Sequence, residues 1–192
     1  MEKILYLLIL IVLFLYPTST YASKEAGTSA SLDSQNIQKK EIDTKEIDTF
    51  AKKSVQRMVI REVLHKYDSP LASEVDGFIN ACMQFDIDCY LLPSIAGLES
   101  TFGKYTYPNS YNPFGWGGGY IMFESWETGF VAVAEGLQKN YIQRGADTIE
   151  TIAPIYAASP TWASRVRYLH NEFERVEAKK TAYFHELAAA LE

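Results

Sequence analysis

The spacing of apolar residues predicts that most of this chain is α-helical. In several stretches, apolar side chains recur every three or four residues, which is the spacing of one buried helix face. Residues that favour helix N-termini, or that interrupt helices, stand at the ends of these stretches. The expected helices run from residue 55 to just before Pro70, and over residues 75–85, 89–101, 125–140, 148–156 and 161–178.

Strand character is confined to residues 120–123. Residues 105–119 are rich in Gly, Pro, Asn and aromatic side chains, and such a composition favours a loop. The expected fold is therefore a mainly α domain of about 110 residues, with a short aromatic and Gly-rich loop or a minimal β-hairpin.

The first 22 residues have the pattern of an export signal. Lys3 precedes an unbroken run of thirteen apolar residues at 4–16, and Thr-Tyr-Ala at 20–22 is a plausible cleavage site. The run is shorter than the roughly 20 residues that cross a bilayer upright. An uncleaved anchor is the alternative, and it would attach the chain to the membrane. In both cases we expect a secreted or cell-envelope, extracytoplasmic protein.

Three further segments follow the expected signal. Residues 23–54 contain few large apolar side chains, so they are predicted to be a flexible polar tether. Residues 55–178 are the expected globular domain, with its motifs between 69 and 174. Residues 179–192 form a tail whose last six residues are either the native end of a helix or vector-derived.

Composition and charge exclude several classes of protein. The net charge is −6 and the pI is near 5.2, so the chain has no broad cationic surface for nucleic acid. Its two cysteines are too few for a disulfide-rich miniprotein. Residues 69–164 carry three basic and ten acidic side chains, so the negative charge is concentrated in the middle of the chain.

Glu99 is an acidic residue on an otherwise apolar helix face. Its neighbours at helical spacing are Leu92, Ile95, Ala96 and Phe102. An apolar setting favours the neutral carboxyl, so we expect a raised pKa, which suits a general acid. A core glutamate bonded to backbone is the alternative. The Gly-rich aromatic loop that follows favours the catalytic interpretation, because backbone and rings can approach a sugar there.

Three ordered motifs carry a family resemblance. They are Glu-Ser-Thr-Phe-Gly-Lys at 99–104, Tyr-Asn-Pro-Phe-Gly at 111–115 and Tyr-Ala-Ala-Ser-Pro-Thr-Trp-Ala-Ser-Arg-Val at 156–166. Together they resemble the motifs of bacterial glucosaminidases, the mannosyl-glycoprotein endo-β-N-acetylglucosaminidase-like domains of the lysozyme-like superfamily. That superfamily also includes lytic transglycosylases. The resemblance implies a lysozyme-like helical fold that cuts the β-1,4 bond between the amino sugars of peptidoglycan.

The resemblance also implies roles for single residues. Glu99 would protonate the leaving glycosidic oxygen, and Tyr156 would lie beside the catalytic centre. The residues that would contact substrate are Ser100, Tyr111, Asn112, Phe114 and Gly115. Trp116 and Trp162 are our own additions, as rings on which a sugar stacks. A structural role for Phe114 and Trp162 is an equal alternative.

One member of the usual constellation is missing. Many glucosaminidases of this type present a second acid after the Asn-x-Phe-Gly motif, but no Asp or Glu occurs between Glu99 and Glu124. Glu124 is the best candidate partner, since Glu127 more simply complements a helix dipole. Without a partner, Glu99 would act first as acid and then as base, in a lytic transglycosylase reaction or in substrate-assisted hydrolysis.

No metal or other cofactor is expected. His65, His170 and His185 lie far apart on charged helices, which predicts solvated side chains. Cys82 and Cys89 would be about 10.5 Å apart on one continuous helix, too far for a disulfide. The Asp-Ile-Asp break at 86–88 allows a closer approach, so the disulfide and the free thiols both remain open.

The leading expectation is an exported peptidoglycan glycosidase that binds glycan strands as a monomer. A non-catalytic wall-binding or assembly protein that keeps the groove is the alternative from another class. Action on another β-1,4-linked amino-sugar polymer, such as chitin, is a third interpretation.

Overall fold

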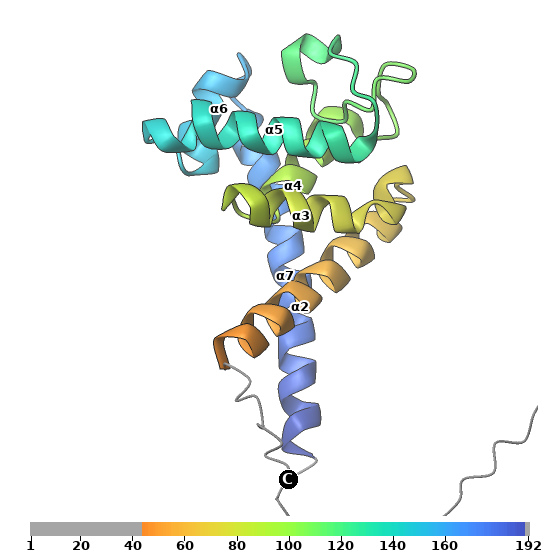
Figure 1. The fold of residues 1–192 in the computed structure, drawn as a ribbon, viewed down its shortest axis with the longest axis vertical. Helices are drawn as coiled ribbons and strands as arrows, with labels where there is room; N and C mark the ends of the chain where they lie inside the picture. Colours follow the sequence, from red (N-terminus) through yellow and green to blue (C-terminus); the bar gives the residue numbers. More distant parts are fainter. Residues whose placement is uncertain (1–43, 191–192) are drawn as a thin grey trace, which may run out of the picture. The chain divides into compact units, whose positions relative to one another are not determined.

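Six α-helices and no strand make up the part of the chain that this computed structural model describes, residues 44–190 (Figure 1). They are α2 (Thr44–Lys66), α3 (Val75–Phe85), α4 (Leu91–Ser100), α5 (Trp126–Asn140), α6 (Ile149–Tyr156) and α7 (Trp162–Ala189). Short 3-10 turns cover Pro70–Ser73, Trp116–Gly119 and Ile142–Arg144. The expected export signal at 1–22, and residues 23–43 of the expected tether, lie outside the described residues. Among the described helices, none has the length and apolar character that a bilayer crossing requires.

Local signals correctly predicted several helix ends. Ser125 and Thr148 each accept a hydrogen bond from the backbone N–H three residues later, and the Thr side chain at that third position bonds back. α3 ends where predicted, because Asp86 adopts a left-handed conformation with φ of 49°. This break brings the Cα atoms of Cys82 and Cys89 to 4.9 Å, and the two cysteines form a disulfide.

Two terminal helices are longer than the sequence pattern predicted. α2 begins at Thr44, inside the segment expected to be tether, and α7 continues to Ala189 instead of ending near residue 178. The two helices pack against each other, and an ion pair between Lys180 and Glu62 joins them at 2.5 Å (Figure 1). In proteins, most helical stability comes from such packing. The added residues 45–52 and 181–190 are themselves exposed, so a search for buried apolar faces does not detect them.

The strand expected at residues 120–123 does not form. One backbone bond, from Phe123 N–H to the Ser110 carbonyl at 2.8 Å, joins the two legs of the loop. The Asn112 side-chain amide donates a hydrogen bond of 3.1 Å to the Ile121 carbonyl. A side chain therefore bonds a backbone group that would bond a partner strand in a hairpin. The loop between α4 and α5 is therefore irregular, as one of the two sequence alternatives proposed.

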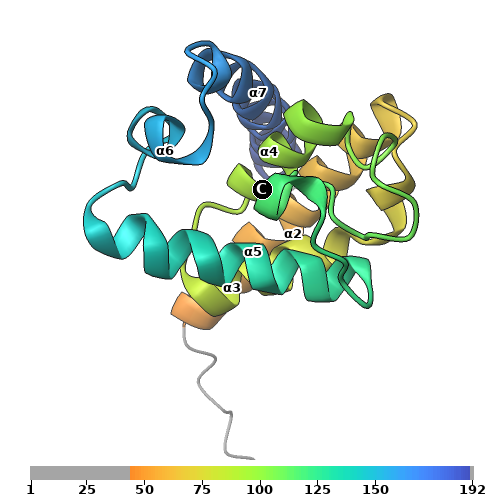
Figure 2. The ribbon, with the colours of Figure 1, turned by 90° about the horizontal axis from the view of Figure 1, so that it is seen from above.

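Buried aromatic rings fix this loop to the helices. α3 packs on α5 and α4 packs on α7 (Figure 2). Phe78 of α3 stacks on Phe130 of α5 with ring centroids 4.0 Å apart, and Phe114 from the loop packs edge-on against Phe130. Phe102, just after α4, lies in the same core against Phe173 of α7. Because Phe102 and Phe114 are both fully buried, the core holds the first two sequence motifs at fixed positions.

Candidate active site

The three sequence motifs meet at the carboxylate of Glu99. Glu99 lies in the last turn of α4, Tyr156 ends α6, and Trp162 begins α7. The Trp162 indole Nε1–H donates a hydrogen bond of 2.7 Å to Glu99 Oε1, and the Trp162 ring stacks on Tyr156 with centroids 4.8 Å apart. The other oxygen, Oε2, faces Gly115: a Cβ atom at that glycine would lie only 3.3 Å from it. Residues from positions 99, 115, 156 and 162 therefore form one cluster.

The expectation that Glu99 is buried in an apolar stripe is wrong. Leu92, Ile95, Ala96 and Phe102 are buried, as the pattern requires, but the Glu99 side chain is exposed. The physical reason is its position: α4 ends one residue later, so no further helical turn covers the carboxylate. The Glu99 carboxylate is thus open to a ligand from solvent.

Gly115 needs to be a glycine for two reasons. Its φ of 63° is left-handed, a conformation that other residues adopt at a cost. A side chain would also crowd Glu99 Oε2 at the distance given above. The glycine at the end of the second motif therefore keeps the space beside this oxygen open.

Tyr156 is held as a hydrogen-bond donor. Its hydroxyl donates to the Phe114 carbonyl at 2.7 Å, which joins the end of α6 to the second motif. Burial raises the pKa of the Tyr156 phenol well above its ordinary value, and the nearby charge of Glu99 raises it further. The phenol therefore stays protonated at neutral pH, and its O–H is committed to the loop backbone.

Ser100 and Asn112 organise the loop from within. Both are only 3% exposed. Ser100 Oγ donates to the Pro113 carbonyl at 2.7 Å and accepts from the Gly103 N–H at 2.8 Å. Asn112 donates to the Trp116 carbonyl at 2.9 Å and accepts from the Trp116 N–H at 3.1 Å. Both side chains were expected to contact substrate, but their polar atoms form hydrogen bonds with the backbone that surrounds the site.

The aromatic residues of the motifs divide into buried and accessible rings. Phe114 is 0% exposed and Trp162 is 3% exposed, which favours the structural alternative for these two rings. Trp116 is half-buried, and its ring lies 5.7 Å from that of Tyr156 and 6.2 Å from that of Tyr141. Trp116 therefore keeps surface that a ligand can reach, as do the half-buried Tyr111 and Tyr156.

An open pocket of about 270 Å³ lies beside Gly115. Its lining residues are Gly115, Trp116, Gly117, Gly118, Tyr141 and Tyr156. Sequence reasoning missed Tyr141, because it follows the end of α5 and belongs to none of the three motifs. The sequence gives little indication that Tyr141 lines a pocket, because a single aromatic residue after an amphipathic helix usually packs in the core.

Two other candidates, Glu124 and Tyr111, do not line the pocket beside Gly115. Glu124 is exposed and does not line the pocket beside Gly115. The Tyr111 ring, half-buried, packs edge-on against Trp126 at 5.2 Å. The described residues that line this pocket include no carboxylate, and Glu99 itself borders it from beside Gly115.

The expectation of a solvated His170 is wrong. Its side chain is 4% exposed, and Nε2 lies 2.7 Å from Asp88 Oδ2. Helical spacing places His170 beside charged residues, but α7 turns this face towards the segment between α3 and α4. Within residues 44–190, no group of three or more His, Cys, Asp or Glu side chains is suited to hold a metal ion.

Comparison with known proteins adds no relative to this description. No protein-family model matches the chain, and no curated protein matches it significantly.

Proposed function

We propose that this protein is an exported, lysozyme-like peptidoglycan glycosidase in which Glu99 is the general acid. The single observation that carries the proposal is the setting of the Glu99 carboxylate. One oxygen is fixed by a neutral donor, Trp162 Nε1–H, and the other opens beside Gly115 and the aromatic pocket. The three motifs that resemble those of glucosaminidases supply this setting from three separate parts of the chain.

The two carboxyl oxygens have different roles in this proposal. Oε1 accepts the indole hydrogen bond throughout, so the proton is carried on Oε2. Oε2 gives that proton to the glycosidic oxygen as the bond to the leaving sugar breaks. The resulting carboxylate then takes a proton from the group that attacks the sugar, which is either water or a hydroxyl of the same sugar. General acid catalysis of this kind contributes about 10²- to 10⁴-fold to a rate.

The pocket supplies contacts for a sugar rather than for an ion. Trp116 and Tyr141 present aromatic rings, and the glycines beside them leave backbone groups accessible to a ligand. The excess of acidic side chains between 69 and 164 disfavours attraction to anionic wall polymers. Binding therefore relies on ring stacking and hydrogen bonds to the glycan strand.

The disulfide supports the extracytoplasmic location in this proposal. Cys82 and Cys89 are bonded, and disulfides persist mainly in oxidising compartments. The apolar run at residues 4–16 agrees with export.

Glu99→Gln tests the proposed acid. Glutamine keeps an oxygen that accepts the Trp162 hydrogen bond but has no proton to give, so release of soluble fragments from purified peptidoglycan should fall by about 100-fold or more. Glu127→Gln, at the exposed start of α5, is the matched control and should retain activity. If Glu99→Gln retained activity and had an unchanged circular dichroism spectrum, Glu99 would not be the general acid.

Mass spectrometry of the products decides the course of the reaction. Anhydro ends indicate attack by a hydroxyl of the same sugar, whereas reducing ends indicate attack by water. If Glu124 takes no part, both courses use Glu99 twice, first as acid and then as base.

A non-catalytic glycan-binding protein is the second candidate, and the observation that favours it is the absence of any Asp or Glu between Glu99 and Glu124 in the sequence. Such a protein would sediment with insoluble peptidoglycan and release no soluble fragments. In that case Trp116→Ala should weaken sedimentation while Glu99→Gln leaves it unchanged.

A further inference from the structure

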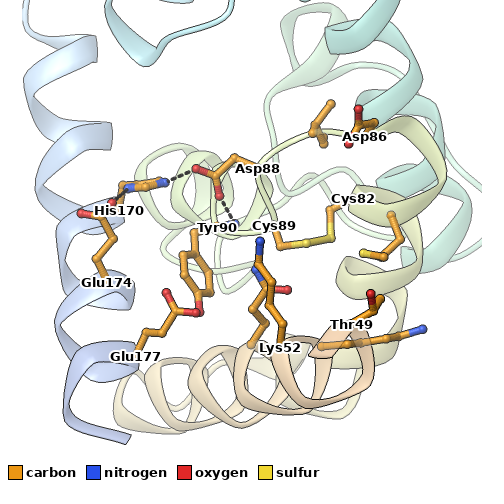
Figure 3. Close-up of a pocket in the computed structure, with 14 residues that line it drawn as sticks. Thr49, Lys52, Cys82, Asp86, Asp88, Cys89, Tyr90, His170, Glu174 and Glu177 are labelled. Carbon is orange, nitrogen blue, oxygen red and sulfur yellow. Dashed lines mark hydrogen bonds and ion pairs between the residues drawn. A yellow bond between two sulfur atoms is a disulfide. The ribbon is translucent and has the colours of Figure 1, made fainter. Parts of the chain in front are cut away.

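A larger cavity, drawn in Figure 3, lies among α2, α7 and the segment that joins α3 to α4. Its buried polar atoms face side chains of the protein itself. The Tyr90 hydroxyl lies against Glu177, and His170 Nδ1 is 3.5 Å from Glu174 Oε1 (Figure 3). Contacts within the chain therefore account for both atoms, and the smaller pocket beside Gly115 is the more informative of the two.

The ring of Trp116, which lines the pocket beside Gly115, rests on a glycine of α5. A Cβ atom at Gly136 would lie 2.5 Å from Cζ2 of the Trp116 indole, 3.0 Å from Cη2 and 3.5 Å from Cε2. The shortest of these distances is below any ordinary contact of a Cβ atom. A side chain at position 136 and the present position of the Trp116 ring therefore exclude each other.

Glycine is an unfavourable residue inside a helix, so its presence at position 136 needs a reason. Glycine loses more conformational freedom than alanine when a helix forms, and alanine would give α5 a more stable helix. Two other helical glycines, Gly77 and Gly97, face the buried core rings of Phe130 and Phe102. Gly136 instead faces a half-buried ring that lines a pocket. Its contact therefore serves the pocket wall rather than the core.

The backbone of Trp116 is fixed separately from its ring. The Asn112 side chain donates to the Trp116 carbonyl at 2.9 Å and accepts from its N–H at 3.1 Å. The ring then moves only by rotation about its own side-chain bonds. The rings of Tyr156 and Tyr141, with centroids 5.7 Å and 6.2 Å away, lie beside it. The space at Gly136 admits the indole against α5, and packing there restricts the remaining rotation.

We propose that Gly136 is a positioning residue for glycan binding. It holds the Trp116 ring against α5, where the ring forms a fixed wall of the pocket on which an amino sugar stacks. This inference rests on the proposed function and extends it to a residue outside the three motifs. A ring that is fixed before binding loses less conformational freedom when the sugar stacks on it, so glycan is bound more tightly than by a mobile ring.

Gly136→Ala tests the placement of the ring independently of activity. The added methyl group meets the outer end of a flexible side chain, so the ring should move while the fold remains. In NMR spectra, the indole N–H signal of Trp116 should shift more than those of Trp126 and Trp162, and its absence in Trp116→Phe identifies it. Circular dichroism should show an unchanged helix content, because alanine favours a helix. An unshifted Trp116 signal would overturn the proposal.

Binding and cleavage of peptidoglycan test the consequence for the glycan. Gly136→Ala should weaken sedimentation with insoluble peptidoglycan, and raise KM for cleavage, by about threefold to tenfold. The kcat should stay nearly unchanged, because Glu99 keeps its hydrogen bond from Trp162. Lys139→Ala introduces the same residue at an exposed position of α5 and is the matched control, which should bind as the parent chain does. Equal losses in the two variants would contradict a specific role for Gly136.

A double variant separates the ring from the helix. Trp116→Phe removes the six-membered ring of the indole, whose outer atoms lie closest to Gly136. Gly136→Ala should therefore weaken binding much less in Trp116→Phe than in the parent chain, and additive losses would contradict the proposal.

The outcomes also separate this inference from the proposed function. If the parent chain binds peptidoglycan and Gly136→Ala binds it equally well, only the role of Gly136 fails. If the parent chain neither binds nor cleaves peptidoglycan, the proposed function fails and the role of Gly136 in glycan binding fails with it.

Discussion

Helix α7 donates an N–H to a carboxylate at two places, and the donors differ in kind. Near its start, Trp162 Nε1 lies 2.7 Å from Glu99 Oε1, and two turns later His170 Nε2 lies 2.7 Å from Asp88 Oδ2. An indole is always a neutral donor, whereas an imidazole gains and loses a proton. Trp162 can therefore hold Glu99 in either protonation state, whereas His170 and Asp88 form an ion pair when the imidazole is protonated.

The surroundings of the two carboxylates also differ: Asp88 is held by the backbone and a nearby disulfide, whereas Glu99 is not. Asp88 also accepts the Tyr90 N–H at 2.8 Å, and the Cys82–Cys89 disulfide closes the segment that carries it. Glu99 is bordered by rings and by a glycine. In the proposed function, the Glu99 region would perform the chemistry, whereas the Asp88 region has the contacts of a stabilising site. Changes in the Asp88 region should lower stability, and changes in the Glu99 region should lower activity.

The largest expected effect on stability is loss of the disulfide. Replacing Cys82 and Cys89 together by Ser should lower the free energy of unfolding by about 2–3 kcal/mol, because the unfolded chain regains the freedom of the short closed loop. Urea unfolding of the variant and of the oxidised parent chain measures the difference. If the double variant cleaved peptidoglycan more slowly at urea concentrations at which it is still folded, the division between the two regions would be contradicted.

Removal of the buried imidazole should have the next largest effect. His170→Leu leaves Asp88 without its partner on α7 and should cost about 2 kcal/mol of unfolding free energy. His185→Leu, on the exposed part of the same helix, should change stability little. Thermal unfolding of both variants makes the comparison, and equal losses would show that the Asp88 pair has no special role.

Trp162→Phe separates the indole N–H from the ring. Phenylalanine keeps an aromatic ring against Tyr156 but loses the donor to Glu99, so kcat for peptidoglycan cleavage should fall about tenfold, or about 1.4 kcal/mol in the barrier. KM should change little, because the indole is buried and does not face the pocket. An unchanged kcat would remove Trp162 from the catalytic arrangement.

The smallest effect expected is a loss of stability in acid. Burial opposes ionisation of Asp88 and Glu172, but hydrogen bonds from His170 to Asp88, and from Lys66 and Tyr67 to Glu172, hold both pKa values below the ordinary 3.8 and 4.5. A carboxyl whose pKa is lowered by folding stabilises the protein at pH values above its ordinary pKa. This stabilisation is lost as the pH falls through the pKa of the folded state. Because Asp88 is about half exposed, its share should be below about 1 kcal/mol.

Unfolding free energies measured from pH 6 downwards test this sign. The parent chain should lose stability below about pH 4, and His170→Leu should lose less over the same range. Identical pH profiles for the two chains would contradict the assignment of this effect to the Asp88 pair.

Local rules were most successful where a single residue decides a helix end. Ser125, Thr148 and Asp86 were identified because capping and left-handed turns depend on neighbours within four residues. Those rules failed for the start of α2 and the end of α7, where residues 45–52 and 181–190 are exposed and show no buried apolar face. They also failed for residues 120–123, because the Asn112 side chain donates a hydrogen bond to the Ile121 carbonyl, which would bond a neighbouring strand in a hairpin.

The candidate site shows the same limit. The resemblance to glucosaminidases implied that Glu99, Gly115 and Tyr156 lie near one another, and in the structure they do. Sequence alone could not tell which oxygen of Glu99 is free, that Ser100 and Asn112 bond to backbone, or that Tyr141 lines the pocket. Each of these depends on side-chain directions set by packing between separate helices.

The sequence by itself determined the helical class, most helix ends in the core and the identity of the candidate acid, because periodicity, caps and motifs are properties of short segments. Only the tertiary structure decided that Glu99 is exposed while His170 is buried. The physical reason is that exposure depends on which elements cover a side chain. α4 ends just after Glu99, whereas α7 turns His170 towards the segment between α3 and α4.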